Sequence, residues 1–597
     1  MKKIVSWKFL GLGLLWLPVL SSLALFVFTA DRGLQMTDEA SYLLIAADPW
    51  RMGGHGTFYG FVLHPLWEIA GGHVTGFRVA GFLILALATL GLCLIAVRRV
   101  ASENPPPILV QGVVPLFLAG SFAFFSDGVR TPHYNWVVLV GAMIWCVGLL
   151  GVTKVDMSGA KVWLGMTTGG IGCSLMVLGK WPGALAVFGV SLLAIGMTRK
   201  ENRSGLIRYW LFSLLIGAAL TGLVLGLYAG PQGVQSCLGR GWVIARELGS
   251  HHASLLLKYL LDLLNFIYRI LRAYAWLVGP LWVLAWLLPK FGIQGGRRFR
   301  ILVLLGFLFG MGLAFLRGHG IGGALNWNKE SLMAGIWLTG VGALTWSGIR
   351  RFSRAEIALS TILLVLPFAL AFGTNTSMAD YAGHAVVFWS LLGWLLLVKT
   401  GVGDRIGSFG LWSILACLVS IQTMRQMSSL EAQWKIGSVW KQTESVSAGP
   451  EQGRLKINWQ FNSDLEATRE ILTQAGFRQG DHLIVISDMP GLVYLLGARS
   501  VGVPWYESWG WEARLRFAKA VLVLQGAAEL EKSWVILAQP IDEPRLEIEQ
   551  VWPKSVKLPV SFGTPEGISW FREWSDEGKA PLRLRLFQPS ANRFRDI

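Results

Sequence analysis

The sequence predicts a polytopic α-helical membrane protein with about thirteen transmembrane helices, followed by a C-terminal α/β domain outside the cytoplasm. Of the 597 residues, 53% are hydrophobic and only 15% are charged, whereas soluble proteins carry roughly 25% charged residues. Apolar runs recur from Phe9 to about Met424, and many approach the ~20 residues that cross a bilayer as a helix. The chain therefore divides into a transmembrane domain, 1–424, and a soluble domain, 425–597.

The first apolar run, Phe9 to Ala30, follows a basic start and has the general form of a signal peptide. It is longer than the roughly 7–15 apolar residues of a signal peptide, and no clear small-x-small cleavage site precedes Asp31. We therefore expect it to be retained as the first transmembrane helix. The predicted spans are 9–29, 78–97, 108–125, 135–152, 162–178, 182–198, 209–229, 271–289, 301–316, 330–347, 355–373, 383–398 and 407–424.

The basic residues between these spans predict the orientation of the chain. If Lys2 and Lys3 lie in the cytoplasm, nearly every loop on that side is basic, as the positive-inside rule requires. The opposite loops carry acids, histidines and aromatic residues, and are 31–77, 126–134, 230–270, 317–329 and 374–382. An odd number of spans places the C-terminal domain on that outer side. We expect a multi-pass protein of a bacterial inner (plasma) membrane, with its chemistry in the outer loops.

Charge and cysteine content exclude two other classes. The net charge of +17 would suggest nucleic-acid binding in a soluble protein, but here the basic residues cluster in short loops between apolar runs. We therefore expect no nucleic-acid partner. The five cysteines lie in or beside apolar segments and show neither a CxxC nor a Cys/His metal spacing, so no disulfide framework is predicted.

The soluble domain shows an alternation of helical and strand-like segments. Residues 442–453 are typical of a linker or loose loop, and 464–475 have a helical pattern. Strand-like runs follow at 482–487, 520–524 and 534–538, which together predict a small α/β domain. Its glycines form neither GxGxxG nor a Walker A loop, so we predict no nucleotide site.

The first outer loop contains a carboxylate pair, Asp38-Glu39, directly before helix-forming residues that include Tyr42. Thr37 or Asp38 could cap that helix, and acids near a helix N-terminus are often there only because they complement its dipole. The same loop continues with Tyr59, His64-Pro65-Leu66 and Arg78-Val79-Ala80. These accompanying residues, more than the spacing of the carboxylate pair, favour a functional site.

Other outer loops add polar candidates. The second loop, 126–134, contains Asp127, Arg130, His133 and Tyr134, although Asp-Gly and Thr-Pro turns and interfacial aromatics also explain such a composition. Later loops contain Arg317, Lys329, Asp380 and Tyr381, and surface solvation explains each singly. Arg317 and Lys329 are also suited to holding a phosphate. His251-His252 precede an amphipathic stretch, 255–270, that is expected along the membrane interface.

Lys180 lies between two mid-chain spans in the sequence Gly179-Lys180-Trp181-Pro182. A lysine near a helix boundary more often only extends its ammonium group toward water. In the predicted topology, however, Lys180 falls on the outer side, where basic residues are disfavoured. A basic residue kept on that side is therefore expected to bind a ligand through its positive charge.

These motifs resemble those of the membrane-embedded GT-C glycosyltransferases, particularly the bacterial aminoarabinose transferases and the protein O-mannosyltransferase relatives. In that family an Asp-Glu-Ala-x-Tyr-like motif is followed by a Lys-Pro-Pro-Leu-like element, an Arg-Leu-Pro-like helix start and a Thr-Lys-Gly-Pro-like element. This chain has Asp38-Glu39-Ala40-Ser41-Tyr42, then His64-Pro65-Leu66, Arg78-Val79-Ala80 and Gly179-Lys180-Trp181-Pro182. His64 stands where the family has a lysine.

The resemblance implies an enzyme that moves a sugar from a polyprenyl-phosphate donor to a lipid, glycan or protein acceptor on the extracytoplasmic face. Asp38 matches the family's first acidic residue and is the candidate general base. Glu39 is expected to orient an acceptor, to support Asp38 or to face the helix N-terminus, and Asp127 is a second candidate acid. The remaining residues predicted to contact substrate are Tyr42, Tyr59, His64, Arg130, His133, Tyr134, Lys180, Arg317, Lys329, Asp380 and Tyr381.

The sequence alone is also compatible with a metal ion in the site and with two other functions. No complete set of metal ligands is evident, but a divalent ion, Mg²⁺ or Mn²⁺, bridging Asp38 and a donor phosphate is compatible with the residues. A polymerase or ligase of lipid-linked oligosaccharides would use the same substrate chemistry, and a transporter of lipids or sugars would also place charges near a membrane. The expected partners are therefore the donor, the acceptor and membrane lipids.

Overall fold

The computed structural model describes most of the chain. The described segments are 2–52, 56–100, 107–126, 128–152, 159–198, 200–247, 257–265, 352–373, 378–400, 437–449, 451–487, 489–504, 511–540, 546–563 and 582–590, with a few single positions between them. The predicted spans at 271–289, 301–316 and 330–347 lie outside these residues, as does most of 407–424. The total of thirteen spans therefore stays a prediction.

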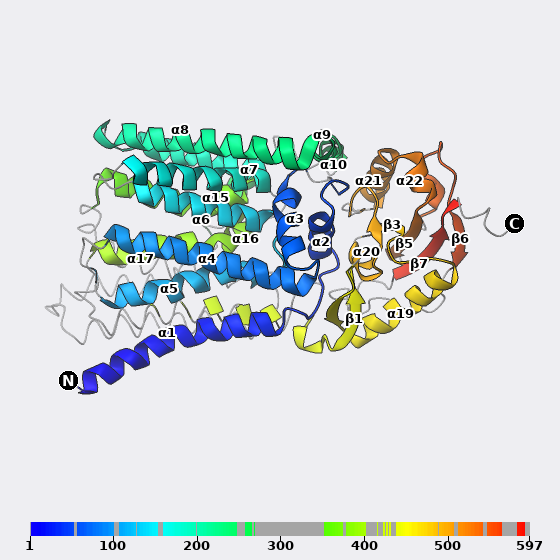
Figure 1. Ribbon diagram of the computed structural model, residues 1–597, viewed down its shortest axis with the longest axis horizontal. Coiled ribbons are helices and arrows are strands. Elements are labelled where there is room, and N and C mark those ends of the chain that lie inside the picture. The colour runs from blue at the N-terminus through cyan, green and yellow to red at the C-terminus, as the bar shows by residue number, and fades with distance from the viewer. Residues whose placement is uncertain are drawn as a thin grey trace.

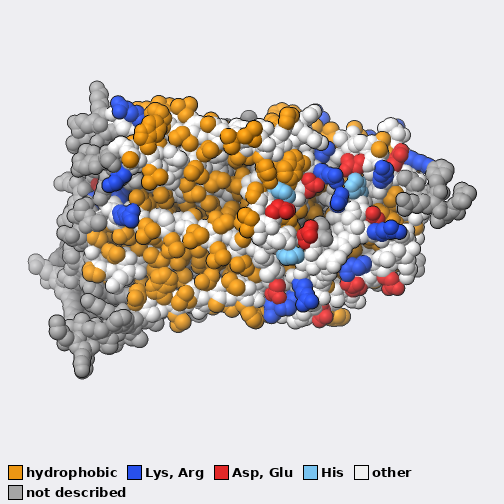
Figure 2. Space-filling view, viewed as in Figure 1, with side chains coloured by type: hydrophobic (Ala, Val, Ile, Leu, Met, Phe, Trp, Pro, Cys, Tyr) orange, Lys and Arg blue, Asp and Glu red, His pale blue; other side chains and the backbone are white. Residues whose placement is uncertain are grey.

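Helices form a bundle in which they lie roughly parallel to one another (Figure 1). Within the described residues, six helices are long and apolar enough to cross a membrane. Hydrophobic side chains cover the bundle in Figure 2, whereas charged side chains gather over the opposite end of the molecule. The bundle contains α1 (Lys2–Phe28), α4 (Val74–Val100), α5 (Pro107–Phe122), α6 (Tyr134–Val152), α7 (Gly159–Gly196), α8 (Lys200–Leu223), α15 (Arg354–Ala371) and α17 (Val386–Thr400).

Helix α7 is two antiparallel spans joined at Lys180, whose backbone is extended (φ −161°, ψ 89°). The first half runs antiparallel to α6, since Gly148 packs against Gly165, Gly141 against Gly172 and Tyr134 against Gly179. It runs parallel to α8, since Ser213 bonds to Met166 and Thr221 to Ser174. The first half of α7 and helix α8 run in the same direction. The second half of α7, which lies between them in sequence, therefore runs in the opposite direction. The separate spans predicted at 162–178 and 182–198 fit this hairpin.

The C-terminal domain contains a five-stranded mixed sheet in the order β4-β3-β5-β7-β6, and a two-stranded antiparallel hairpin, β1-β2. The strands are β1 (Glu444–Ala448), β2 (Gly453–Ile457), β3 (His482–Ile486), β4 (Arg499–Ser500), β5 (Trp534–Pro540), β6 (Val560–Gly563) and β7 (Leu582–Gln588). The helices are α19 (Trp459–Gln474), α20 (Gly491–Leu495), α21 (Trp511–Val523) and α22 (Ala527–Glu531). The helix predicted at 464–475 and the strands at 482–487 and 534–538 are confirmed.

Two predictions for this domain are wrong. The run 520–524 lies largely at the end of α21 and is no strand. Its buried residues, Val521 and Leu522, are adjacent in sequence, which fits a helix face and not the alternation of a strand. The segment 442–453 is no loose linker, because it contains β1, whose Val446 and Ala448 are buried. A short polar strand with alternating burial is easily taken for a loop when only composition is considered.

Two short helices, α2 (Asp38–Ala47) and α3 (Tyr59–Ile69), lie between the bundle and the sheet domain (Figure 1). The C-terminal domain is bonded directly to the segment that leads into α2. Lys456 N–H donates to Asp31 O at 2.6 Å, Gly33 N–H donates to Lys456 O at 2.8 Å, and the two side chains Lys456 and Asp31 pair at 2.7 Å. Gly491 N–H donates to Met36 O at 2.9 Å. The first loop and the C-terminal domain are therefore on one side of the bundle.

We expect this shared side to face away from the cytoplasm. Reporter fusions after residues 100, 205 and 402 should report a cytoplasmic location, whereas a fusion after residue 440 should report an extracytoplasmic one, because the loops at the far end carry the Lys and Arg residues that set orientation. Alkaline-phosphatase and fluorescent-protein reporters measure the two locations. A cytoplasmic signal after residue 440 would reverse the proposed orientation.

Candidate functional site

The two members of the carboxylate pair have different surroundings. Glu39 is fully buried and forms a two-point ion pair with the equally buried Arg78, with Nε to Oε1 at 3.0 Å and a terminal nitrogen to Oε2 at 2.7 Å. Its carboxylate also accepts the N–H groups of Arg130 and Gln35, each at 3.1 Å. Both oxygens of the Glu39 carboxylate thus accept hydrogen bonds, whereas Asp38 is only partly buried.

Two arginines hold the chain where it leaves α1. Arg78 donates to the carbonyl oxygens of Ala30 at 2.8 Å and Gly33 at 2.7 Å. Arg130 donates to Thr29 O at 2.6 Å and Phe26 O at 3.2 Å. Carbonyls at a helix C-terminus lack intrahelical partners and carry partial negative charge, so buried cations there are stabilising. Burial, and the nearby Arg78, lower the pKa of Arg130 to about 9, which leaves it charged at neutral pH.

The start of α2 is fixed by Gln35 and not by a hydroxyl. Thr37 is at the N-cap position, but its side chain forms no capping hydrogen bond. Instead Glu39 N–H donates to Gln35 Oε1 at 2.7 Å while Gln35 N–H donates back to the Glu39 carboxylate. This reciprocal pair satisfies free backbone donors at the helix start, as a capping box does. It fixes the backbone on both sides of Asp38.

Asp38 begins α2 beside a cluster of aromatic side chains. Tyr42 is four residues later and therefore on the same face of the helix. The Tyr42 ring lies 6.0 Å from that of Tyr59 and 5.7 Å from that of Tyr134, and stacks on His133 at 4.8 Å. The structure thus brings four predicted substrate contacts together next to the candidate base.

The tyrosine hydroxyls of this cluster stay protonated. Burial raises the pKa of Tyr42 and of Tyr59 well above the ordinary value, and the Asp38 carboxylate is among the smaller causes for each. Both therefore keep a hydrogen to donate at neutral pH. The Tyr59 hydroxyl is buried and has no hydrogen-bond partner among the residues that the structure describes. Such an orphaned group beside a carboxylate is a feature of binding sites.

Lys180 lies on the bundle side of this cluster. The extended backbone at the α7 turn directs its ammonium toward the end of α15, where it donates to Ala371 O at 3.1 Å and Leu370 O at 3.3 Å. The same nitrogen is 5.9 Å from the centre of the Tyr134 ring and 5.7 Å from that of Tyr381. The two tyrosine hydroxyls are 3.4 Å apart. Lys180 is thus a buried cation at the edge of the cluster.

Two further aromatic residues complete the cluster although the sequence did not single them out as site residues. His384 stacks on Tyr381 at 5.4 Å, and Phe124 lies 5.1 Å from His133 and 5.3 Å from His384. His384 follows Tyr381 by three residues across α16 (Met378–Ala382), which is the one signal that could have found it. Phe124 gave no such signal, because a phenylalanine inside an apolar run is indistinguishable from ordinary core.

Other predicted site residues lie elsewhere or outside the described residues. His64 is on α3, where its Nδ1 is 2.8 Å from Ala46 O and its ring lies 5.1 Å from that of Trp50. Ala46 is eight residues beyond Asp38, roughly 12 Å along the helix, so His64 is at the far end of α2. Structure is not described for Asp127, Arg317 and Lys329, nor for the side chain of Asp380.

The metal prediction gains no support from the described residues. Among them, no group of three His, Cys, Asp or Glu side chains is arranged to hold a metal ion. Glu39, the carboxylate nearest to Asp38 in sequence, is committed to Arg78. The residues in view therefore do not fit a resident metal site, and we assign no step of the reaction to one.

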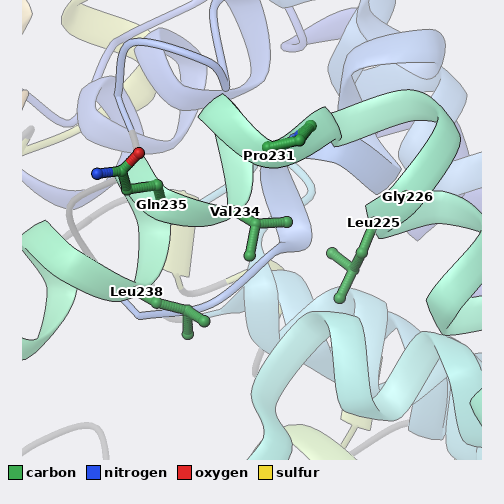
Figure 3. A pocket seen from close by; sticks show the side chains of 6 residues that line it. All are labelled: Leu225, Gly226, Pro231, Val234, Gln235 and Leu238. Carbon is green, nitrogen blue, oxygen red and sulfur yellow. The ribbon is translucent and has the colours of Figure 1, made fainter.

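A recess of about 470 Å³ lies on the helical segment that follows α8, and its lining is almost wholly apolar (Figure 3). It is lined by Leu225, Gly226, Pro231, Val234, Gln235 and Leu238. Without convergent polar groups it offers no means to orient a reacting substrate. We therefore place the candidate site at the tyrosine cluster.

No protein-family model and no curated protein matches the chain. Solved structures similar to it include the oligosaccharyltransferase of Archaeoglobus fulgidus in complex with Zn and sulfate, with 15% identity over 88% of this chain and 67% of the other, and a TM-score of 0.42. They also include ArnT of Cupriavidus metallidurans bound to undecaprenyl phosphate, with 12% identity over 96% and 98% of the two chains, and a TM-score of 0.40.

ArnT is an aminoarabinose transferase. A further structure is of the Archaeoglobus fulgidus enzyme in complex with an inhibitory peptide and a dolichol-phosphate, at 13% identity. Identities and TM-scores this low transfer no residue role, and the function of this chain has to be argued from its own side chains.

Proposed function

We propose that this chain is an integral-membrane glycosyltransferase that moves a sugar from a polyprenyl-phosphate donor to a lipid, glycan or protein acceptor on the extracytoplasmic face. One observation carries the proposal. A partly buried carboxylate, Asp38, lies at the edge of a cluster of aromatic, hydroxyl-bearing side chains, and a buried lysine lies on the other side of that cluster. The buried ion pair of the next residue, Glu39, holds the backbone at Asp38 in place. Base, sugar-binding surface and phosphate-binding cation are thus close together.

In the proposed reaction, Asp38 accepts the proton of the acceptor hydroxyl as that oxygen forms a bond to the anomeric carbon. The bond between this carbon and the phosphate oxygen breaks, and its electron pair leaves with the polyprenyl phosphate. General-base catalysis is typically worth about 10²–10⁴-fold. The phosphate is already a good leaving group, so the protein has mainly to hold it and to activate the acceptor.

The surrounding residues take supporting roles. Lys180 binds the donor phosphate by a charge-assisted hydrogen bond. Tyr42, Tyr59 and Tyr134 contact the sugar, since aromatic faces suit its C–H surface and protonated hydroxyls donate to its oxygens. Glu39 acts through position only, by holding the start of α2. Asp127 is proposed as a second catalytic acid, and further substrate contacts are proposed for His133, Tyr381, Asp380, Arg317 and Lys329. Such contacts are proposed also for Arg130 and His64, although these side chains contact backbone carbonyls in the structure.

Two other functions are compatible with a site of this kind. An oligosaccharide polymerase or ligase would consume a lipid-diphosphate glycan and extend it, and a transporter would bind a lipid-linked sugar without breaking it. Purified chain in lipid bilayers, supplied with a polyprenyl-phosphate sugar and candidate acceptors, distinguishes them. Release of polyprenyl phosphate with a glycosylated acceptor supports the proposal, whereas translocation of intact donor would support transport.

Lys180→Ala should weaken the use of donor more than the use of acceptor, raising the donor KM because the phosphate loses its cation. Lys180→Arg should restore only part of the donor affinity, since a guanidinium differs from an ammonium in shape. Steady-state kinetics with each substrate varied in turn measure the difference.

Lys161 provides the matched control, because it is an exposed lysine near the start of α7, at the end of its first half away from Lys180. Lys161→Ala should leave both Michaelis constants unchanged. Normal donor kinetics in a folded Lys180→Ala protein would show that Lys180 bonds only to the end of α15 and does not bind the donor.

A further inference from the structure

Two tryptophans of the C-terminal domain, Trp440 and Trp459, are exposed to solvent although both are large and apolar. Trp459 is 64% exposed at the start of α19, and Trp440 is 36% exposed in the short helix η7 (Val439–Lys441). Both flank the β1-β2 hairpin, because β1 begins four residues after Trp440 and β2 ends two residues before Trp459. The hairpin pairing thus places the two indoles at the same end of the domain.

This end of the domain adjoins the point where α1 leaves the bundle. The guanidinium of Arg32 lies over the ring of Phe28 at 5.2 Å and over that of Trp440 at 5.9 Å. Phe28 is 63% exposed and is the last residue of α1, which the sequence predicts to cross the membrane. One side chain therefore connects the end of a transmembrane helix to a tryptophan of the C-terminal domain.

The backbone holds Trp459 near the end of α1, as Arg32 holds Trp440. Trp459 follows Lys456 by three residues, and Lys456 is bridged to Arg32 and paired with Asp31. Indoles favour the boundary between hydrocarbon and water, where the ring is in apolar surroundings and the N–H reaches headgroups. Arg32 and the exposed Lys441 supply the positive charge that phospholipid phosphates attract.

We infer that Trp440 and Trp459 insert into the headgroup layer of the outer leaflet and anchor the C-terminal domain to the membrane surface. The occupant of this surface is phospholipid, because the patch is continuous with the lipid-facing end of α1. The anchor also braces the site: the hairpin it holds is bonded to residues 31–33, only a few residues before Asp38. This inference does not depend on the reaction proposed above.

Environment-sensitive fluorophores attached to single introduced cysteines test the anchor in the full-length chain in phospholipid nanodiscs. The substitutions are Trp459→Cys, Trp440→Cys and, as the matched control, Ser561→Cys on β6, an exposed position at the far end of the sheet (Figure 1). Parent protein treated with the same reagent gives the background from its native cysteines. Nitroxides carried by the lipids near the headgroup or deep in the acyl chain report depth.

We expect the probes at 440 and 459 to emit at shorter wavelength than the probe at 561, and to lose intensity most with the headgroup-proximal nitroxide. Position 459 decides, because its side chain is the more exposed of the two. Nitroxide quenching no stronger at 459 than at 561 would overturn the anchor, as would efficient quenching at 459 by aqueous iodide, which would show a surface left open for a protein partner.

Discussion

Asp38→Asn should abolish most sugar transfer while leaving expression and donor binding largely intact. The amide keeps the size of the carboxylate, so the start of α2 and its capping by Gln35 should persist. It cannot accept the proton of the acceptor hydroxyl, and loss of a general base typically costs about 10²–10⁴-fold in rate. The measurement is single-turnover transfer from a polyprenyl-phosphate sugar by purified protein in lipid, with donor binding measured separately.

Asp48 offers the matched control for this substitution. It is at the other end of α2, where it pairs with Arg51 on the surface. Asp48→Asn should transfer sugar at nearly the normal rate, because it changes the same chemical group on the same helix away from the tyrosine cluster. If Asp38→Asn also retained near-normal turnover, the base would have to be another residue, and Asp127 would be the next to substitute.

Much of the bundle could be predicted because a bilayer imposes length and composition on each span. The start of α6 at Tyr134 and the end of α15 at Ala371 fall within two residues of their predicted limits. Even the hairpin at Lys180 was visible, since a polar residue and a proline interrupt an apolar run that is too long for one span. In lipid the backbone polar groups must be satisfied within the segment, so a long apolar run forms a helix whatever its neighbours are.

The C-terminal domain was harder to predict, because there the partner of each strand decides its structure. Residues 520–524 have the composition of a strand, yet they continue α21 and bury Val521 and Leu522 against the sheet as a helix does. The exposed strand β1 exists because it pairs with β2 and its hairpin is bonded to the segment after α1. No local pattern contains that long-range pairing.

The candidate site was only partly predictable for the same reason. The sequence indicated Asp38, Tyr42 and Lys180 by motif, and the structure brings Tyr42 close to Tyr134 and Lys180 close to the same ring. The sequence named Asp38 as the candidate base by resemblance, but it left three roles open for Glu39 and did not show its ion pair with Arg78. The surroundings of Glu39 depend on Arg78, which is 39 residues away in sequence, and on the backbone N–H of Arg130 in the second outer loop.

That ion pair leads to the second large effect. Arg78→Ala should destabilise the folded protein by about 3–5 kcal/mol, because removing one partner leaves the buried Glu39 carboxylate uncompensated. It also leaves the carbonyls of Ala30 and Gly33 without their donor. Since the loop before Asp38 loses its support, transfer should fall along with stability. Equilibrium unfolding in mixed micelles measures the free energy.

Arg51→Ala is the control, because Arg51 pairs with Asp48 on the surface, where both side chains are more than 40% exposed. Surface pairs contribute only about 0–1 kcal/mol, so this variant should unfold close to the parent. In the double variant Arg78→Met, Glu39→Gln the buried charges are gone together, and the loss should be smaller than the sum of the single losses if the pair is coupled. Additive losses would show that Arg78 acts through the backbone carbonyls alone and that Glu39 does not depend on it.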